Sequence, residues 1–283
     1  MSYIQDLLLR LRRSRWWIAI QLVGTPLLLA AGLAWTQLPD RHWWQVVLTL
    51  LIPLLLVISI LEVEAGTMRS LADDDGKRVK LVWGACTVLV WAGLFWACWA
   101  ALDWCDDQIP AWASYLNSKA SAGLRATTFT YAHLAHWLTV TEWILRWILV
   151  PGKIIPYAVV SAQWGWRIPF RRVIRLLLGW RWWPAVIAAS LVGVSLPAHF
   201  FSTLPHGTVS AQIWAVAWKL VATYLLVIGA WVLLLAWAAI LLDRSAPGAE
   251  DNGDEQGEPV AVGAGPHGED AVSLPLPQEG DGI

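Results

Sequence analysis

The sequence is poor in charged residues, in cysteine and in every aromatic residue except tryptophan. Charged residues make up 14% of the 283 positions, against ~25% in soluble globular domains. The three cysteines form no C-x-x-C pair, which excludes a disulfide scaffold and the usual zinc spacings. The hydrophobic share of 57% excludes a disordered chain as a whole. Together these features exclude an ordinary soluble enzyme and indicate a protein with several membrane spans.

Motifs of the common catalytic folds are also missing. The apolar segments contain no P-loop, no G-x-S-x-G and no G-x-G-x-x-G, and His133 and His136 do not have the spacing of H-E-x-x-H. Asp103, Asp106 and Asp107 lie close enough in sequence to bind a divalent cation through oxygen atoms. That cluster stands alone, and a solvated helix end is the favoured interpretation. The sequence therefore predicts no catalytic residue, no metal site, no cofactor and no nucleic-acid partner.

Long apolar segments are the main positive feature. A bilayer core of ~30 Å needs about 20 apolar residues per helix. The segments that clearly meet this requirement are Trp16–Leu38, Trp43–Leu61, Leu81–Leu102, Trp182–Phe201 and Ile213–Leu242. A sixth, Tyr131–Val150, meets it less clearly because it contains Glu142 and Arg146. Pro151-Gly152 can either end this helix or unwind a longer one, and we expect it to end the helix because a basic loop follows.

The net charge of −1 conceals two regions of opposite sign. Residues 243–283 carry ten acidic residues and one basic residue, Arg244, a net charge of −9, whereas the preceding 242 residues carry +8. Pro, Gly, Asp and Glu dominate the acidic region, which holds no aromatic residue. Such a composition cannot bury enough apolar surface to offset chain entropy. We therefore predict a membrane-embedded helical domain over residues 1–242 and a disordered acidic cytoplasmic tail over residues 243–283.

Basic residues determine the expected orientation. They gather before the first apolar segment (Arg10 to Arg15), between the second and third (Arg69 to Lys80), and after the fourth (Arg167 to Arg181). Cytoplasmic loops are enriched in Lys and Arg, and these groups share one side only if the chain crosses six times. The sequence thus predicts a multi-pass protein of the cell membrane with both termini in the cytoplasm.

Two basic segments have the pattern of amphipathic helices lying in the membrane interface. Ser2–Arg15 opens with Ser2 and Gln5 at the spacing of a capping box. Arg167–Arg181 places apolar residues at helical spacing opposite its arginines. The arginines expected to contact anionic lipid headgroups are Arg167, Arg171, Arg172 and Arg175. The simpler interpretation, a topology signal with arginines snorkelling into water, stays open.

The segment His133–Lys153 carries a polar stripe on an otherwise apolar helix. Thr139, Glu142 and Arg146 lie on one face, and Glu142 and Arg146 are spaced i,i+4, so that they can neutralise each other. Lys219, in the last apolar segment, can either turn outward or join this pair. Two interpretations remain: a structural ion pair that fixes helix packing, or a substrate or proton pathway.

Tryptophan and small residues also predict packing. Most of the 23 tryptophans lie near segment ends, where indole prefers the headgroup region, but Trp91 and Trp231 lie nearer the centres and must pack on helices or lipid tails. Small residues recur every four positions, which allows close approach of helices within the chain or between copies. The two small-residue faces are Ala185, Ala189 and Gly193, and Gly93, Ala97 and Ala101.

These patterns favour an all-α polytopic integral membrane protein with six transmembrane helices and two interfacial amphipathic helices. The leading functional hypothesis is a non-enzymatic scaffold or accessory subunit that contacts the lipid bilayer and either a membrane-protein partner or a second copy. The alternative is a small transporter or channel subunit with a polar pathway at Glu142 and Arg146. A membrane enzyme that uses the aspartates of 103–107 is the third hypothesis.

Overall fold

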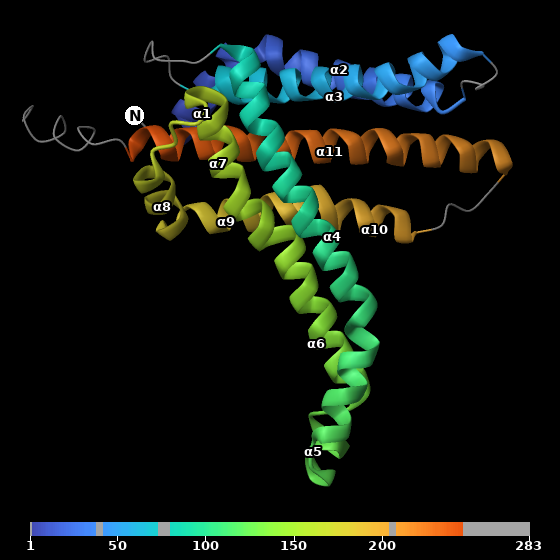
Figure 1. The fold of residues 1–283 in the computed structure, drawn as a ribbon. Helices are drawn as coiled ribbons and strands as arrows, with labels where there is room; N and C mark the ends of the chain where they lie inside the picture. Colours follow the sequence, from blue (N-terminus) through green and yellow to red (C-terminus); the bar gives the residue numbers. More distant parts are fainter. Residues whose placement is uncertain (1, 38–41, 73–79, 204–207, 246–283) are drawn as a thin grey trace, which may run out of the picture. The chain divides into compact units, whose positions relative to one another are not determined.

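A computed structural model describes residues 2–37, 42–72, 80–203 and 208–245, and these residues form helices and connecting turns without any strand. The helices, drawn in Figure 1, are α1 (Tyr3–Arg13), α2 (Arg15–Trp35), α3 (Trp43–Leu71), α4 (Leu81–Lys119), α5 (Ala122–Thr127), α6 (Tyr131–Ile144), α7 (Val150–Trp164), α8 (Phe170–Leu178), α9 (Trp182–Ser190), α10 (Leu196–Ser202) and α11 (Val209–Arg244). The predicted all-helical class is confirmed for this part of the chain. The capping box of Ser2 and Gln5 at the start of α1 is also confirmed.

Within the described residues, six helices are long and apolar enough to cross a membrane, as the sequence predicted. They are Arg15–Trp35, Trp43–Leu71, Leu81–Lys119, Tyr131–Trp164, Trp182–Ser202 and Val209–Arg244. The last of them continues through Asp243 and Arg244, which the sequence analysis had placed in the acidic tail. From residue 246 onward the predicted tail lies outside the described residues.

The expectation that Pro151 ends the sixth apolar helix is wrong. A π-helical turn, η1 (Leu145–Leu149), connects α6 to α7, so the chain stays helical from Tyr131 to Trp164. The amide of Val150 donates to the carbonyl of Leu145 in the wider i→i+5 pattern, directly before the proline. A second π-helical turn, η2 (Leu191–Ser195), stands at the same distance before Pro197. Both wide turns lie directly before a proline, whose missing amide removes a backbone hydrogen bond from the helix.

The interpretation of the Asp103, Asp106 and Asp107 cluster as a helix end is also wrong. Helix α4 continues beyond these residues to Lys119 and contains Pro110. Because the residues from Asp103 onward pack along α6, tertiary contact extends a helix that the apolar run alone would end near Leu102.

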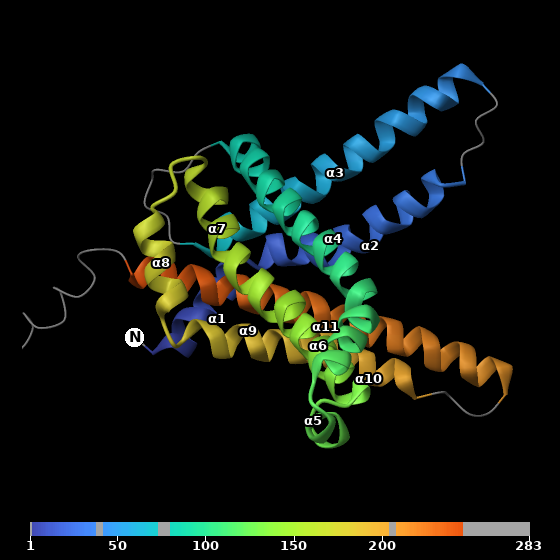
Figure 2. The same cartoon turned by 60° about the horizontal axis from the view of Figure 1, so that its bottom comes forward.

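The helices associate as neighbouring pairs with one shared core. Helix α2 packs on α3, α4 on α6 and α7, and α9 with η2 on α11, and both views show these pairs side by side (Figures 1 and 2). The buried cluster lies where the end of α3, the length of α7 and the second half of α11 meet, and it includes Met68, Val159, Leu235 and Trp182. In contrast, the most apolar window of α3 has no buried residue at all.

Glycines permit the closest approaches within this core. A Cβ on Gly66 of α3 would lie 2.1 Å from the ring of Trp17 of α2. A Cβ on Gly84 of α4 would lie 2.6 Å from the carbonyl oxygen of Ala162 of α7. Both contacts lie well inside van der Waals range, so only glycine fits these positions without movement of the Trp17 ring or of the α7 backbone.

Of the two small-residue faces, one is used for packing within the chain. A Cβ on Gly193, in η2, would meet the Cβ of Ala230 of α11 at 3.4 Å, so α9–η2 and α11 approach closely there. Gly93 on α4 faces open space, with nothing within 4 Å of an added Cβ. The centrally placed tryptophans pack on helices: Trp91 stacks on Tyr157 of α7, with ring centroids 4.9 Å apart.

Candidate polar sites in the helix bundle

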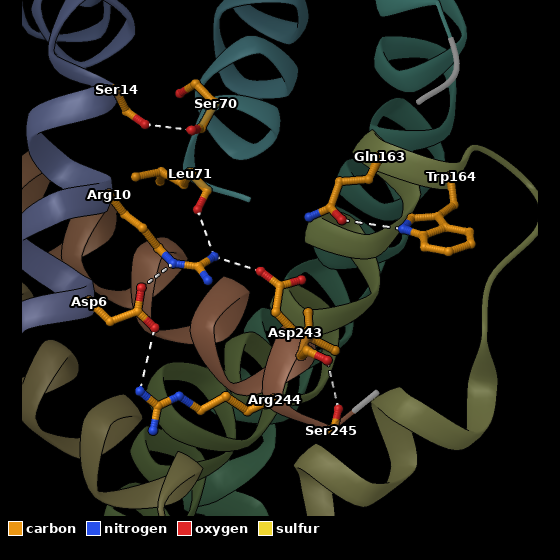
Figure 3. Close-up of polar contacts among 11 residues, drawn as sticks. Asp6, Arg10, Ser14, Ser70, Leu71, Gln163, Trp164, Asp243, Arg244 and Ser245 are labelled. Carbon is orange, nitrogen blue, oxygen red and sulfur yellow. Dashed lines mark hydrogen bonds and ion pairs between the residues drawn. The ribbon is translucent and has the colours of Figure 1, made fainter. Parts of the chain in front are cut away.

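A buried arginine joins α1 to the ends of two other helices. Arg10 is 6% exposed. Its Nε donates to Asp6 at 2.9 Å, and its Nη1 donates to the carbonyl of Leu71 at 3.1 Å and to Asp243 at 2.6 Å (Figure 3). Leu71 ends α3 and Asp243 lies in the last turn of α11. Because a helix leaves its last carbonyls without backbone donors, Arg10 supplies a donor to α3 while it pairs with a carboxylate of α11.

A second arginine completes this cluster. Arg244 Nη2 lies 3.6 Å from Asp6 Oδ2, and the Arg244 guanidinium carbon lies 3.8 Å from the ring centroid of Tyr3. The hydroxyl of Ser14 donates to the carbonyl of Ser70 at 2.6 Å and adds a bond between the α1–α2 junction and α3. Two arginines therefore offset two aspartates, and α1 is attached to the ends of α3 and α11 by a nearly neutral polar network, which we call the Arg10 cluster.

A carboxyl group lies between three of the long helices. Glu64 of α3 accepts from Gln21 Nε2 of α2 at 2.9 Å and from the indole N–H of Trp231 of α11 at 3.0 Å. Gln21 is fully buried, and its Oε1 has no hydrogen-bond partner in the part of the chain that the structure describes. Glu64 thus connects α2, α3 and α11. Its bond to Trp231 satisfies the indole N–H of a tryptophan that lies near the centre of a span.

The predicted pair of Glu142 and Arg146 forms and gains a third member. Arg146 Nε donates to Glu142, and Arg146 Nη1 donates to Asp103 Oδ1 of α4 at 2.5 Å. The side chains of Glu142 and Arg146 are 13% and 15% exposed, whereas that of Asp103 is 64% exposed. The guanidinium carbon also lies 5.4 Å from the ring centroid of Trp99. Arg146 therefore binds α6–η1 to α4 through a carboxylate and an aromatic face.

Thr139 of the predicted polar stripe and Lys219 of the last apolar segment both lie apart from this cluster. Thr139 is exposed, and its side chain makes no hydrogen bond within the described residues. The ammonium of Lys219 donates to the backbone carbonyl of Thr203 and, at 3.0 Å, to its hydroxyl, at the loop between α10 and α11. Lys219 forms no ion pair with Glu142.

The arginines around α8 divide into two groups. The guanidinium of Arg172 lies 5.3 Å from the ring centroid of Trp164, and Arg175 Nη1 donates to the carbonyl of Ser245 at 2.9 Å. The side chains of Arg167 and Arg171 are exposed and make no hydrogen bond or ion pair within the described part of the chain. These two side chains are therefore free to bind an external anion.

Side chains from neighbouring helices bind carbonyl groups that prolines leave without a donor. In an α-helix the carbonyl of residue i accepts from the amide of residue i+4, and proline has no amide hydrogen. The donor, the acceptor carbonyl and the responsible proline are Tyr224, Leu22 and Pro26 (2.7 Å); Trp35, Thr49 and Pro53 (3.1 Å); and Trp182, Gly152 and Pro156 (2.8 Å). Ser190 likewise donates to the carbonyl of Trp147 at 2.5 Å, within the wide turn directly before Pro151. Each bond joins two helices, so these prolines act as attachment points between helices as well as interruptions within them.

Three hollows lie on the described surface away from Glu142 and Arg146. An apolar groove of about 400 Å³ runs between α9–η2 and α11. A hollow of about 700 Å³ at the turn from α7 to α8 is lined by Trp83, Trp164, Trp166 and Arg167 among others. A third, of about 560 Å³, is lined by residues that include Arg13, Trp17 and Arg69.

Among the described residues no three His, Cys, Asp or Glu side chains converge as metal ligands would. In particular, Asp103 is drawn to Arg146 and does not form a site with Asp106 and Asp107. Comparisons of the chain with protein-family models, curated proteins and solved structures found no match.

Sequence reasoning missed the Arg10 cluster and the Glu64 site. Asp6 and Arg10 have i,i+4 spacing, which signals a pair, but Asp243 is far away in sequence and its surroundings have the composition of a tail. Glu64 has no residue of opposite charge at i±3 or i±4 on α3, and its two donors come from α2 and α11. The sequence signal for this site was the position of Glu64, just past the end of the apolar segment Trp43–Leu61.

Proposed function

We propose that the chain is a multi-pass protein of the cell membrane that acts as a non-enzymatic scaffold or accessory subunit through helix packing and contacts with lipid or another membrane protein. The observation that carries this proposal is that ionisable groups within the candidate spans are used to connect helices. Arg146 joins α6–η1 to α4, and Glu64 joins α2, α3 and α11. Charged groups in a bilayer are costly unless paired, and here the partners lie within the chain.

In the same proposal both termini are cytoplasmic, and α1 and α8 lie in the membrane interface. The exposed Arg167 and Arg171 then face anionic headgroups, which carry a negative potential at the cytoplasmic leaflet. The Arg10 cluster lies at the same end of the bundle as α8, since Arg175 of α8 binds Ser245 directly after α11. A partner subunit or a second copy would contact the apolar surface that α2 and α3 leave unburied.

Cysteine accessibility distinguishes this proposal from a transport pathway. Glu142→Cys and Thr139→Cys would be introduced into the full chain, after replacement of its native cysteines, and treated with a membrane-impermeant maleimide. A scaffold predicts that position 142 is protected from both sides of the membrane. Arg171→Cys should label only from the cytoplasmic side, and Lys119→Cys, at the end of α4, only from the outside.

Labelling of position 142 from either side, together with ion flux in proteoliposomes, would replace the scaffold by the channel alternative. Labelling of position 171 only from the outside would overturn the orientation and leave the scaffold proposal standing. A matched stability measurement on Glu142→Gln completes the test, because an ion pair that fixes packing must lower the unfolding temperature when its charge is removed.

A further inference from the structure

The apolar groove between α9–η2 and α11 has an open floor. Every residue that lines it is apolar, and its floor is built from small side chains on both helices, including Ala185, Ala189 and Gly229. A Cβ added to Gly229 would meet nothing within 4 Å, so the space above this glycine is empty. The volume of about 400 Å³ falls within the ~300–1,000 Å³ typical of sites for small ligands.

The rim of this groove consists of exposed aliphatic side chains. Leu225 and Leu233 of α11 are each 48% exposed, and Val192 of η2 is 40% exposed. Both helices that form the groove belong to candidate membrane spans. Once these spans lie in a bilayer, the groove opens toward lipid tails, and a slender apolar ligand fits it without any polar group to satisfy.

One end of the groove carries positive charge. Trp237 and Leu7 line this end, and the Trp237 indole N–H donates to the carbonyl of Arg181 at 3.2 Å. The ring of Tyr3 lies on Trp237, with centroids 5.6 Å apart, and the Arg181 guanidinium donates to the Tyr3 hydroxyl. Arg181 is exposed and forms no ion pair within the described residues.

A second arginine, Arg244, lies at the same end of the groove, and the charge of Arg181 is not neutralised there. The guanidinium carbons of Arg181 and Arg244 lie 5.0 and 3.8 Å from the centroid of the same Tyr3 ring. Asp6 approaches Arg244 at 3.6 Å but is shared with Arg10, so one positive charge remains next to an apolar channel. A phosphate at the end of a hydrocarbon chain matches both features, because guanidinium groups bind phosphate oxygens in a bidentate manner.

From this geometry we infer that the groove holds one acyl chain of an anionic phospholipid whose phosphate binds Arg181. This inference rests on insertion of the chain into a bilayer, but it does not depend on whether the protein is a scaffold or a channel subunit. It concerns a site different from the exposed arginines of α8, which would contact headgroups without seating a chain.

The test measures phospholipid retention and thermal stability of the full-length protein in detergent. Phosphatidylglycerol and phosphatidylcholine with identical acyl chains would be titrated, and bound lipid counted by native mass spectrometry. We expect phosphatidylglycerol to bind about tenfold more tightly than phosphatidylcholine, because the choline cation of phosphatidylcholine lies beside the same phosphate and is repelled by Arg181. Arg181→Gln should abolish this preference, whereas the control Arg125→Gln, at an exposed arginine of α5, should retain it.

Two groove variants test the acyl chain. Gly229→Leu fills the open floor and should prevent retention of both lipids; Ala188→Leu at the exposed rim serves if the first variant fails to fold. Soluble glycerol phosphate should not stabilise the wild-type protein, since it lacks the chain. The inference is overturned if glycerol phosphate binds as well as the lipid, or if retention is unchanged in the groove variants. It is also overturned if Gly229→Leu converts a dimer to a monomer without loss of lipid, because the groove would then hold a second copy.

Discussion

The indole N–H of Trp182 donates a hydrogen bond to the carbonyl oxygen of Gly152, 2.8 Å away. Regular helix geometry would give this carbonyl the amide of residue 156, which is proline and has no hydrogen. Trp182 is fully buried, so water does not satisfy the carbonyl in its place. A side chain of α9 therefore restores the bond that a proline removes from α7.

This relationship predicts coupling between Trp182 and Pro156. Trp182→Phe keeps an aromatic ring but removes the donor, and we expect it to lower the free energy of unfolding by about 1–2 kcal/mol beyond the loss of ring volume. Pro156→Ala restores a backbone amide to Gly152. In that background the hydrogen-bond part of the cost should disappear, which a double-mutant cycle in thermal or denaturant unfolding measures.

Trp180→Phe is the matched control, since Trp180 is 76% exposed and adjoins the same helix start. It should leave stability unchanged. An equal cost of Trp182→Phe with and without Pro156 would show that the bond has no role in compensating the proline.

Tyr224 makes the same kind of bond in another part of the bundle. Its hydroxyl donates to the carbonyl of Leu22 at 2.7 Å, the carbonyl that Pro26 leaves without a donor, and so joins α11 to α2. We expect Tyr224→Phe to cost about 1 kcal/mol, and less when Pro26→Ala is also present. Tyr115→Phe, at a side chain that is 61% exposed, is the control in the same unfolding assay. If the Tyr224→Phe protein were as stable as the wild type, the bond between Tyr224 and Leu22 would not compensate for Pro26.

Local sequence patterns were sufficient to predict the elements but not their partners. Hydrophobic run lengths clearly predicted five of the six apolar helices, and the distribution of basic residues favoured the sixth. Spacing of i,i+3 or i,i+4 predicted the Ser2 capping box and the Glu142–Arg146 pair. The capping box and the ion pair each lie within one or two turns of a single helix. Asp103 joins Arg146 from a different helix, and no pattern within either helix specifies that contact.

Prolines show why the length of helices was harder to predict. A proline in a lone helix costs ~3 kcal/mol, which favoured a helix end at Pro151. In the structure η1 provides a wide turn before this proline, and Ser190 of α9 binds the carbonyl of Trp147. The compensating group lies on another helix, so the sequence of α6 and α7 alone could not reveal it.

The Arg10 cluster predicts that α1 is attached to the bundle by charge. Arg10→Met keeps the aliphatic stem but leaves the carbonyl of Leu71 without its donor and Asp243 without this cation. We expect a loss of about 2–3 kcal/mol, below the ~3–5 kcal/mol of a fully buried pair because the Asp6 and Asp243 side chains keep 21% and 29% exposure. Thermal unfolding and the rate of protease cleavage within α1 both measure this effect.

Arg12→Met is the control for this experiment, because Arg12 lies on the exposed side of the same helix. It should change neither measurement. If Arg10→Met and Arg12→Met behaved alike, the bonds of Arg10 to α3 and α11 would contribute nothing to the attachment of α1.

The orphan oxygen of Gln21 makes a specific prediction for Glu64. In Glu64→Gln the new amide can accept from Trp231 and, after rotation of the Gln21 amide, donate to Gln21 Oε1, an oxygen that has no hydrogen-bond partner among the described residues. The number of hydrogen bonds is then conserved and a carboxyl group leaves the interior, so stability should stay within about 1 kcal/mol of the native value. Glu64→Leu leaves the Trp231 N–H and the Gln21 amide without an acceptor and should cost about 2–4 kcal/mol in the same unfolding measurement. If Glu64→Gln proved as destabilising as Glu64→Leu, the site would require the carboxylate itself and not merely two acceptors.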